Sequence, residues 1–207
     1  TDMTTAKKFT ILFALPILLL IGITLVVGVF GVDVKIARLC FVDGQGFVHG
    51  KKIPWQLLNH WGEIPAYLLS IAAFIVLVAS LFVPTVRRYR SASIFLVLLL
   101  ILGQGVFVNF IFKGHWGRPR PSSIIEFGGK QHFTHPWQIN PNGSGKSFPS
   151  GHVSLAFYMA APYFLLRKIR PKQSLLWLAG GGSYGVLMSI ARILQGKHFF
   201  SDTVWSG

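Results

Sequence analysis

The chain has little of three things: cysteine, acidic side chains and charge in general. The single cysteine, Cys40, excludes a disulfide framework within the chain and cannot build a zinc site alone. Asp and Glu number only 6, and Glu126 is the one acidic residue between Glu63 and Asp202. The sequence therefore offers no cluster of carboxylates of the kind that binds divalent cations.

Charged residues make up only 13% of the chain and apolar residues 52%, and the mean hydropathy is positive. This is the profile of a protein that crosses a membrane several times. A length of 207 residues suits one domain, spanning 1–207. The net charge of +14 fits nucleic acid, anionic lipid or a phosphorylated substrate as partner. Nucleic acid is the weakest of these, because so apolar a chain offers no solvated basic face.

Five apolar segments are long enough to consider as membrane spans, although the fourth is short for a crossing of about 20 residues. A helix then begins near the end of the chain, and this layout calls for one more span. We therefore expect an all-α polytopic membrane helix bundle with a six-span layout whose sixth span is missing from the sequence. The five segments are 9–32, 64–83, 92–112, 153–166 and 175–194.

Three basic clusters indicate the orientation of the spans. Lys7-Lys8 precedes the first span, Arg87-Arg88-Arg90 follows the second, and Arg167-Lys168-Arg170-Lys172 follows the fourth. None contains an acidic residue, and all fall on one side of the membrane. By the positive-inside rule that side is cytoplasmic, so 113–152 and the chain beyond the fifth span lie on the other side.

Four cations lie at span ends on this second side: Lys113, Arg118, Arg120 and Arg192. Charged residues there are functional candidates by default, and the forked donors of arginine fit phosphate oxygens. Arg118 is expected either to join the phosphate cations or to face lipid headgroups. The alternative for any single cation is that it extends to the phosphates of neighbouring lipids.

Pro149-Ser150-Gly151-His152 lies where the fourth apolar helix begins. Gly151 permits close approach of an anion to the backbone, and the N–H groups of a first helical turn point at such an anion. Ser150 has a hydroxyl that can donate to a phosphate oxygen. Its alternative role is an ordinary N-cap, and the two roles are compatible.

His198 and Asp202 are spaced i, i+4, so on a helix they share a face. The carboxylate can then accept a hydrogen bond from one imidazole nitrogen, which leaves the other nitrogen free to attack. Such a pair is often only structural. Arg192, six residues earlier, and the second histidine, His152, at the same membrane face favour catalysis.

Lys113-x6-Arg120-Pro121, Pro149-Ser150-Gly151-His152 and Arg192-x5-His198-x3-Asp202 together resemble the signature of the type 2 phosphatidic acid phosphatase superfamily. One departure is Ala191, where the family has serine. The resemblance implies a phosphatase without metal or cofactor, in which His198 forms a phosphohistidine, Asp202 orients it and His152 protonates the leaving oxygen. It assigns phosphate binding to Lys113, Arg120, Arg192 and Ser150.

The segment between the first two motifs, including Glu126-Phe127-Gly128-Gly129 and Trp137, is similar to that of bacterial lipid A 1-phosphatases. This implies an enzyme of the bacterial inner membrane whose site faces the periplasm, with lipid A 1-phosphate as the favoured substrate. Phosphatidylglycerophosphate and undecaprenyl diphosphate are alternatives. So are a lipid-to-lipid phosphotransferase and a lipid-binding or transport protein without catalysis. The expected partners are the bilayer and a phospholipid or lipid A; the oligomeric state is left open.

Overall fold

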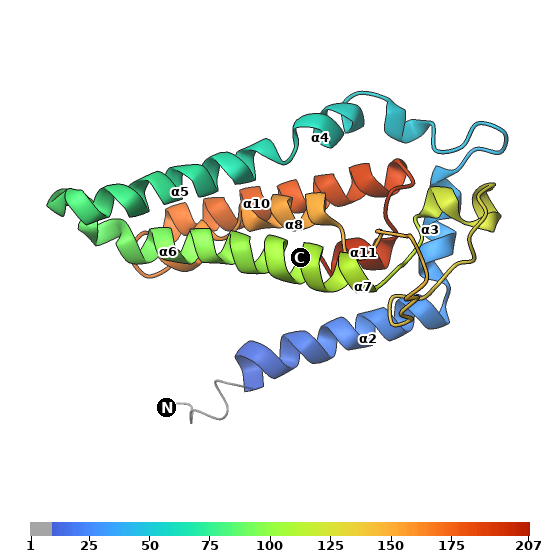
Figure 1. Cartoon of the computed structure of the whole chain (residues 1–207), viewed down its shortest axis with the longest axis horizontal. Coiled ribbons are helices and arrows are strands. Elements are labelled where there is room, and N and C mark those ends of the chain that lie inside the picture. Colours follow the sequence, from blue (N-terminus) through green and yellow to red (C-terminus); the bar gives the residue numbers. More distant parts are fainter. Residues whose placement is uncertain (1–9) are drawn as a thin grey trace.

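The structure is a computed structural model that describes residues 10–207 (Figure 1), and its regular elements are all helices. The expectation of an all-α membrane helix bundle is therefore confirmed. Lys7-Lys8 and Phe9, where the first span was expected to start, lie outside the described residues.

Three helices are long and apolar enough to cross a membrane, Trp55–Phe82, Pro84–His115 and Pro171–Leu194. They contain the expected spans at 92–112 and 175–194, and all but the last residue of the one at 64–83. The first comprises α4 (Trp55–Trp61) and α5 (Ile64–Phe82). The second comprises η3 (Pro84–Tyr89), α6 (Arg90–Leu99), the wider π-type helix η4 (Leu100–Phe112) and α7 (Lys113–His115); the third is α10 (Pro171–Leu194).

The first expected span is a bent pair, α2 (Leu15–Val29, preceded by η1, Thr10–Ala14) and α3 (Val32–Cys40). The two axes differ by 67°, and Gly31 between them has a φ of 60°, which is costly for any other residue type. The fourth expected span is shorter than a full crossing and is made of α8 (Gly151–Tyr158) and α9 (Pro162–Leu166). The part of the chain that the structure describes thus has three candidate spans, or four if the bent pair is one.

Helix α10 lies against α8 inside the bundle, and glycines let the two helices approach (Figure 1). A Cβ atom at Gly181 would collide with the backbone at Met159 and Ala160, and one at Gly185 would collide with the ring of Phe157. Small residues at such crossings are typical of membrane helices, which associate largely through close packing.

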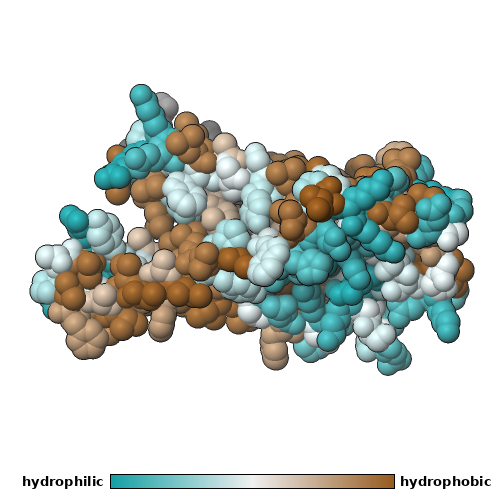
Figure 2. All heavy atoms as spheres, turned by 90° about the horizontal axis from the view of Figure 1, so that it is seen from above, coloured by the Kyte–Doolittle hydropathy of each residue, from teal (hydrophilic) through white to brown (hydrophobic). Residues whose placement is uncertain are grey.

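The two ends of the bundle differ. The turns that carry Arg87-Arg88-Arg90 and Arg167-Lys168-Arg170-Lys172 lie at one end in Figure 1, as the sequence predicts, while α3, α7 and the 116–150 segment lie at the other. Figure 2 shows hydrophilic side chains over a broad area at this second end, a smaller group of them at the first end, and hydrophobic ones over much of the part between. Many large apolar side chains on the spans are exposed, among them Phe82 and Phe110, as expected of surfaces that face lipid.

Three short elements complete the second end. They are the 3₁₀ turns η2 (His49–Lys51), η5 (Pro121–Ser123) and η6 (Ile125–Phe127). The last helix, α11 (Phe200–Val204), follows a tight turn after α10 and lies beside α3 and α2. Trp205 donates from Nε1 to Thr24 Oγ1 over 2.9 Å, which attaches this helix to α2.

Candidate active site

The three sequence motifs meet at the polar end of the bundle. Motif one comes from α7 and the loop after it, motif two from the start of α8, and motif three from the end of α10 and the turn into α11.

His198 lies in the turn before α11 and is 3% exposed. Its Nδ1 lies 2.6 Å from the backbone carbonyl oxygen of Ser147. A carbonyl only accepts hydrogen bonds, so Nδ1 carries the proton and Nε2 keeps its lone pair. Burial lowers the pKa of His198 to about 4, with Arg192 adding to the effect and Asp202 opposing it. The imidazole is therefore neutral near pH 7, as a nucleophile must be.

Asp202 does not accept a hydrogen bond from His198, because Nδ1 and Oδ2 are 3.8 Å apart. Since α11 begins only at Phe200, the two residues do not share the helix face that their spacing predicted. Ser147 joins them instead, because its carbonyl accepts from His198 and its Oγ donates to Asp202 Oδ2 over 2.5 Å. Asp202 also accepts from the Phe199 amide at 2.7 Å, which places the carboxylate at the start of α11.

Arg118 is the second group that fixes Asp202. It is fully buried; Nη1 donates to Asp202 and to Ser201 Oγ, and Nε donates to the Thr134 carbonyl over 2.9 Å. Its Nη2 donates over 2.8 Å to Asp33 on α3. The structure thus places Arg118 between two carboxylates, not among the phosphate cations or at the headgroups, where the sequence interpretation had put it.

The charge of Asp202 follows from these neighbours. Burial alone raises the pKa of a carboxyl group, but Arg118, His198 and Ser147 together hold the Asp202 pKa below its ordinary value. An ionised carboxylate near a neutral imidazole can stabilise positive charge that forms on that imidazole.

The remaining predicted cations are drawn together around the start of α8. A Cβ atom at Gly151 would lie 2.8 Å from Lys113 Nζ and 2.9 Å from Gln104 Nε2, so the lysine amine lies against the first helical turn. Arg192, at the end of α10, is buried, and its Nη1 donates to Asn59 and to Gln195 Oε1. Lys197, which the sequence interpretation missed, has a pKa lowered by burial and then by the nearby charges of Arg120 and Arg192.

Three polar atoms in this cluster are buried without a hydrogen-bond partner among the described residues. They are Arg120 Nε, Arg192 Nε and Ser150 Oγ. Leaving such groups unpaired costs about 1–3 kcal/mol each, and more when the group is charged. The set has the donors and the positive charge that a phosphate group requires.

His152 lies on α8 beside two hydrogen-bond acceptors. Its Nδ1 is 2.9 Å from Glu63 Oε1, and its Nε2 is 3.3 Å from the carbonyl oxygen of Asn59. Both neighbours are hydrogen-bond acceptors, so a ring nitrogen that carries a hydrogen has an acceptor within reach. Asn59 links the two halves of the site, because its side chain binds Arg192.

Sequence reasoning missed five of these residues: Asp33, Asn59, Glu63, Ser147 and Lys197. The acidity of Asp33 and Glu63 within apolar surroundings was the one available signal. Among residues 10–207 no group of three or more His, Cys, Asp and Glu side chains has a geometry that suits a metal ion.

Comparisons with known proteins bear on this site. Residues 94–207 match the model of the PAP2 superfamily, which covers all three motifs. A lipid A 4′-phosphatase of Francisella tularensis subsp. novicida is 35% identical over 72% of this chain and 67% of its own length. A lipid A 4′-phosphatase of Rhizobium leguminosarum is 33% identical over 51% of this chain and 44% of its own length. A lipid A 4′-phosphatase of Rhizobium etli is 34% identical over 56% of this chain and 44% of its own length.

The matches thus span between 44% and 67% of these relatives. All three are 4′-phosphatases, so the expected resemblance to lipid A 1-phosphatases is corrected. The crystal structure of a transmembrane PAP2 type phosphatidylglycerolphosphate phosphatase from Bacillus subtilis has the same fold, with a TM-score of 0.54 at 21% identity over 92% of this chain and 86% of that one. The chain belongs to the PAP2 superfamily and is a membrane lipid phosphatase of that family.

Proposed function

We propose that this enzyme removes the 4′-phosphate of lipid A through a phosphohistidine on His198. The proposed reaction takes place at the periplasmic face of the bacterial inner membrane, and the proposed membrane layout has six spans. The observation that carries the phosphate chemistry is the set of buried donors without a partner, Arg120 Nε, Arg192 Nε and Ser150 Oγ, beside a neutral His198. The names of the three relatives support the 4′ position, and the basic clusters at the opposite end of the bundle support the periplasmic side.

In the first step His198 Nε2 attacks phosphorus, and the bond from phosphorus to the sugar oxygen breaks. His152 transfers its proton to that oxygen, which leaves as a hydroxyl group. Arg120, Arg192 and Ser150 hold the charge that spreads over the remaining phosphate oxygens. In the second step a water molecule attacks the phosphohistidine, His152 takes the water proton, and inorganic phosphate and free His198 are released.

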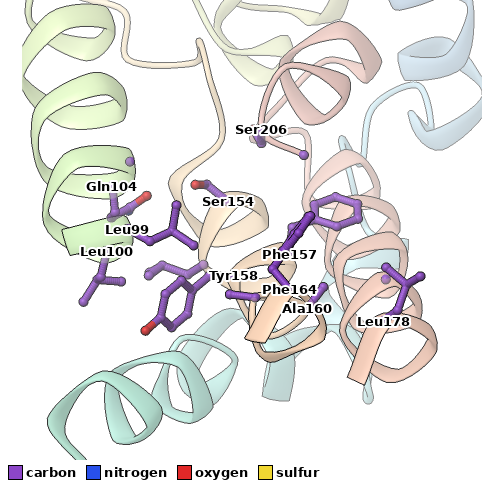
Figure 3. A pocket seen from close by; sticks show the side chains of 15 residues that line it. Leu99, Leu100, Gln104, Ser154, Phe157, Tyr158, Ala160, Phe164, Leu178 and Ser206 are labelled. Atoms are coloured by element: carbon purple, nitrogen blue, oxygen red, sulfur yellow. The ribbon is translucent and has the colours of Figure 1, made fainter. Parts of the chain in front are cut away.

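A lipid substrate is supported by a cavity of about 450 Å³ between η4, α8 and α10 (Figure 3). Most of its lining is apolar and includes Leu99, Phe157 and Phe164. Gln104 and Ser154 line it as well. Gln104 Nε2 also lies against Gly151, next to the groups proposed to bind phosphate. An acyl chain bound in this cavity would therefore lie next to the residues proposed to bind phosphate.

The experiment is a substrate panel for the purified protein in detergent. It contains lipid A carrying only the 4′-phosphate, lipid A carrying only the 1-phosphate, phosphatidylglycerophosphate and undecaprenyl diphosphate. We expect the highest kcat/KM for the 4′-phosphate, measured as released inorganic phosphate. A clear preference for any other member would overturn the proposed substrate. Phosphate appearing on an added acceptor lipid instead of in water would identify a phosphotransferase.

A further inference from the structure

A second cavity, of about 390 Å³, borders the phosphate site and is not used by the steps above. Its size lies within the ~300–1,000 Å³ typical of ligand pockets. It is formed by the loop that follows α3, by η2 and α4, by η5 and η6, and by the turn after α10. Its lining includes Phe41, Phe47, Gln45, Gln56, Asn59 and Lys197.

This cavity is continuous with the catalytic groups. Asn59 and Gln195 both line it, and both accept hydrogen bonds from Nη1 of Arg192. Lys197 lines it and directly precedes His198. Ser122, two residues after Arg120, lines it and donates from its backbone N–H to the Gly196 carbonyl over 3.0 Å.

The cavity also lies near His152, the group that protonates the leaving oxygen in the proposed mechanism. The leaving oxygen must reach the proton of His152 while phosphorus stays within reach of His198. His152 Nε2 is 3.3 Å from the backbone carbonyl of Asn59, which lines the cavity. A headgroup attached to that oxygen therefore extends toward Asn59 and the space beyond it.

The lining suits a ring rich in hydroxyl groups. Gln45 and Gln56 have side-chain amides that bind no other group among the described residues, and each offers both donors and an acceptor. Phe41, Phe47 and Phe127 pack with ring centroids 5.1–5.5 Å apart and provide an apolar wall. Amides for hydroxyl groups and an aromatic wall for the apolar face match a pyranose ring, whereas an acyl chain would leave these amides unused. No Asp or Glu lines the cavity, so a phosphorylated headgroup meets no like charge.

We propose that this cavity binds the sugar ring that carries the scissile phosphate, and so selects glycolipid phosphates over lipid phosphates without a sugar. This sugar site rests on the proposed function. It consists of residues outside the proposed catalytic groups that would recognise the headgroup of the substrate. Gln45 and Gln56 are its specificity-determining residues.

The test compares Gln56→Ala and Gln45→Ala with the parent on two substrates, lipid A carrying only the 4′-phosphate and phosphatidic acid. Gln56→Trp, which fills the cavity, serves as a stronger variant. Both glutamines are exposed, so the variants are expected to fold. The matched control is Gln173→Ala, an exposed glutamine near the start of α10 at the opposite end of the bundle.

We expect kcat/KM on lipid A to fall about tenfold for each alanine variant, the effect of one lost hydrogen bond, and further for Gln56→Trp. Activity on phosphatidic acid should change less than about twofold, and Gln173→Ala should match the parent on both substrates. Equal losses on the two substrates, or no loss on lipid A, would overturn the sugar site alone. A parent enzyme that hydrolyses phosphatidic acid but not lipid A would overturn the proposed substrate as well.

Discussion

The buried pair of Asp33 and Arg118 leads to a prediction about stability. Asp33 is 2% exposed; its Oδ2 accepts from Arg118 and from Ser201 Oγ, and its Oδ1 accepts from the Ser201 amide at 2.8 Å. Asp33→Asn keeps the size and one acceptor but removes the negative charge. Arg118 is then left with Asp202 as its one carboxylate partner among the described residues.

Removing one partner of a buried ion pair destabilises a protein by about 3–5 kcal/mol, because the other charge stays buried. Asp202 still neutralises Arg118, so we expect a loss near the lower end, about 3 kcal/mol. The matched control is Asp43→Asn. Asp43 pairs with Arg38 at 2.8 Å, but its side chain is 76% exposed, and exposed pairs contribute about 0–1 kcal/mol.

The assay is unfolding of each purified variant in mixed micelles with increasing sodium dodecyl sulfate, followed by circular dichroism and tryptophan fluorescence. The account predicts a much lower midpoint for Asp33→Asn and a midpoint near that of the parent for Asp43→Asn. Equal midpoints for the two variants would refute the view that α3 is attached to Asp202 through Arg118.

Three further predictions concern the site. The pKa of His198 is lowered from an ordinary 6.5 to about 4, so the folded protein takes up a proton on His198 less readily than the unfolded chain does. The stability that the neutral His198 contributes is therefore lost as pH falls from about 6.5 toward 4. Thermal midpoints at pH 7.5 and 5 should differ less in His198→Asn than in the parent, and an equal difference would contradict the assignment. Arg120→Ala should lower kcat/KM roughly tenfold to a hundredfold, because it removes a charged hydrogen bond to phosphate. The control Arg87→Ala, at the opposite end of the bundle, should leave kcat/KM unchanged. Equal effects of the two substitutions would speak against a phosphate role for Arg120. Activity should persist in a chelator, and inhibition reversed by added metal would exclude the metal-free mechanism.

The spans and the candidate histidines of the site could be proposed from the sequence for different reasons. Apolar runs such as 64–83 are recognisable because a bilayer requires about 20 consecutive apolar residues. His152 and His198 were recognisable because each lies in a short motif whose members are neighbours in the chain. The fold then brings both motifs to one end of the bundle, as the loop charges predicted.

The supporting groups were not predictable because they come from distant parts of the chain. Asp33 lies 85 residues before Arg118, and Glu63 reaches His152 from another span. The i, i+4 spacing of His198 and Asp202 assumed a helix that starts only at Phe200, so the bridge through Ser147 could not be foreseen. Nothing in the sequence says which of two nearby arginines pairs with buried carboxylates, and it is Arg118 that does so.

Trapping a covalent intermediate would show whether His198 Nε2 attacks phosphorus. The parent and His198→Asn are mixed with lipid A labelled with ³²P at the 4′-phosphate and quenched within milliseconds. Asparagine is chosen because its amide can replace the Nδ1 donor to the Ser147 carbonyl while offering no nucleophile. The account predicts acid-labile, base-stable label on the parent, none on the variant, and a loss of several orders of magnitude in phosphate release. Equal hydrolysis by the two proteins, or equal labelling, would contradict it.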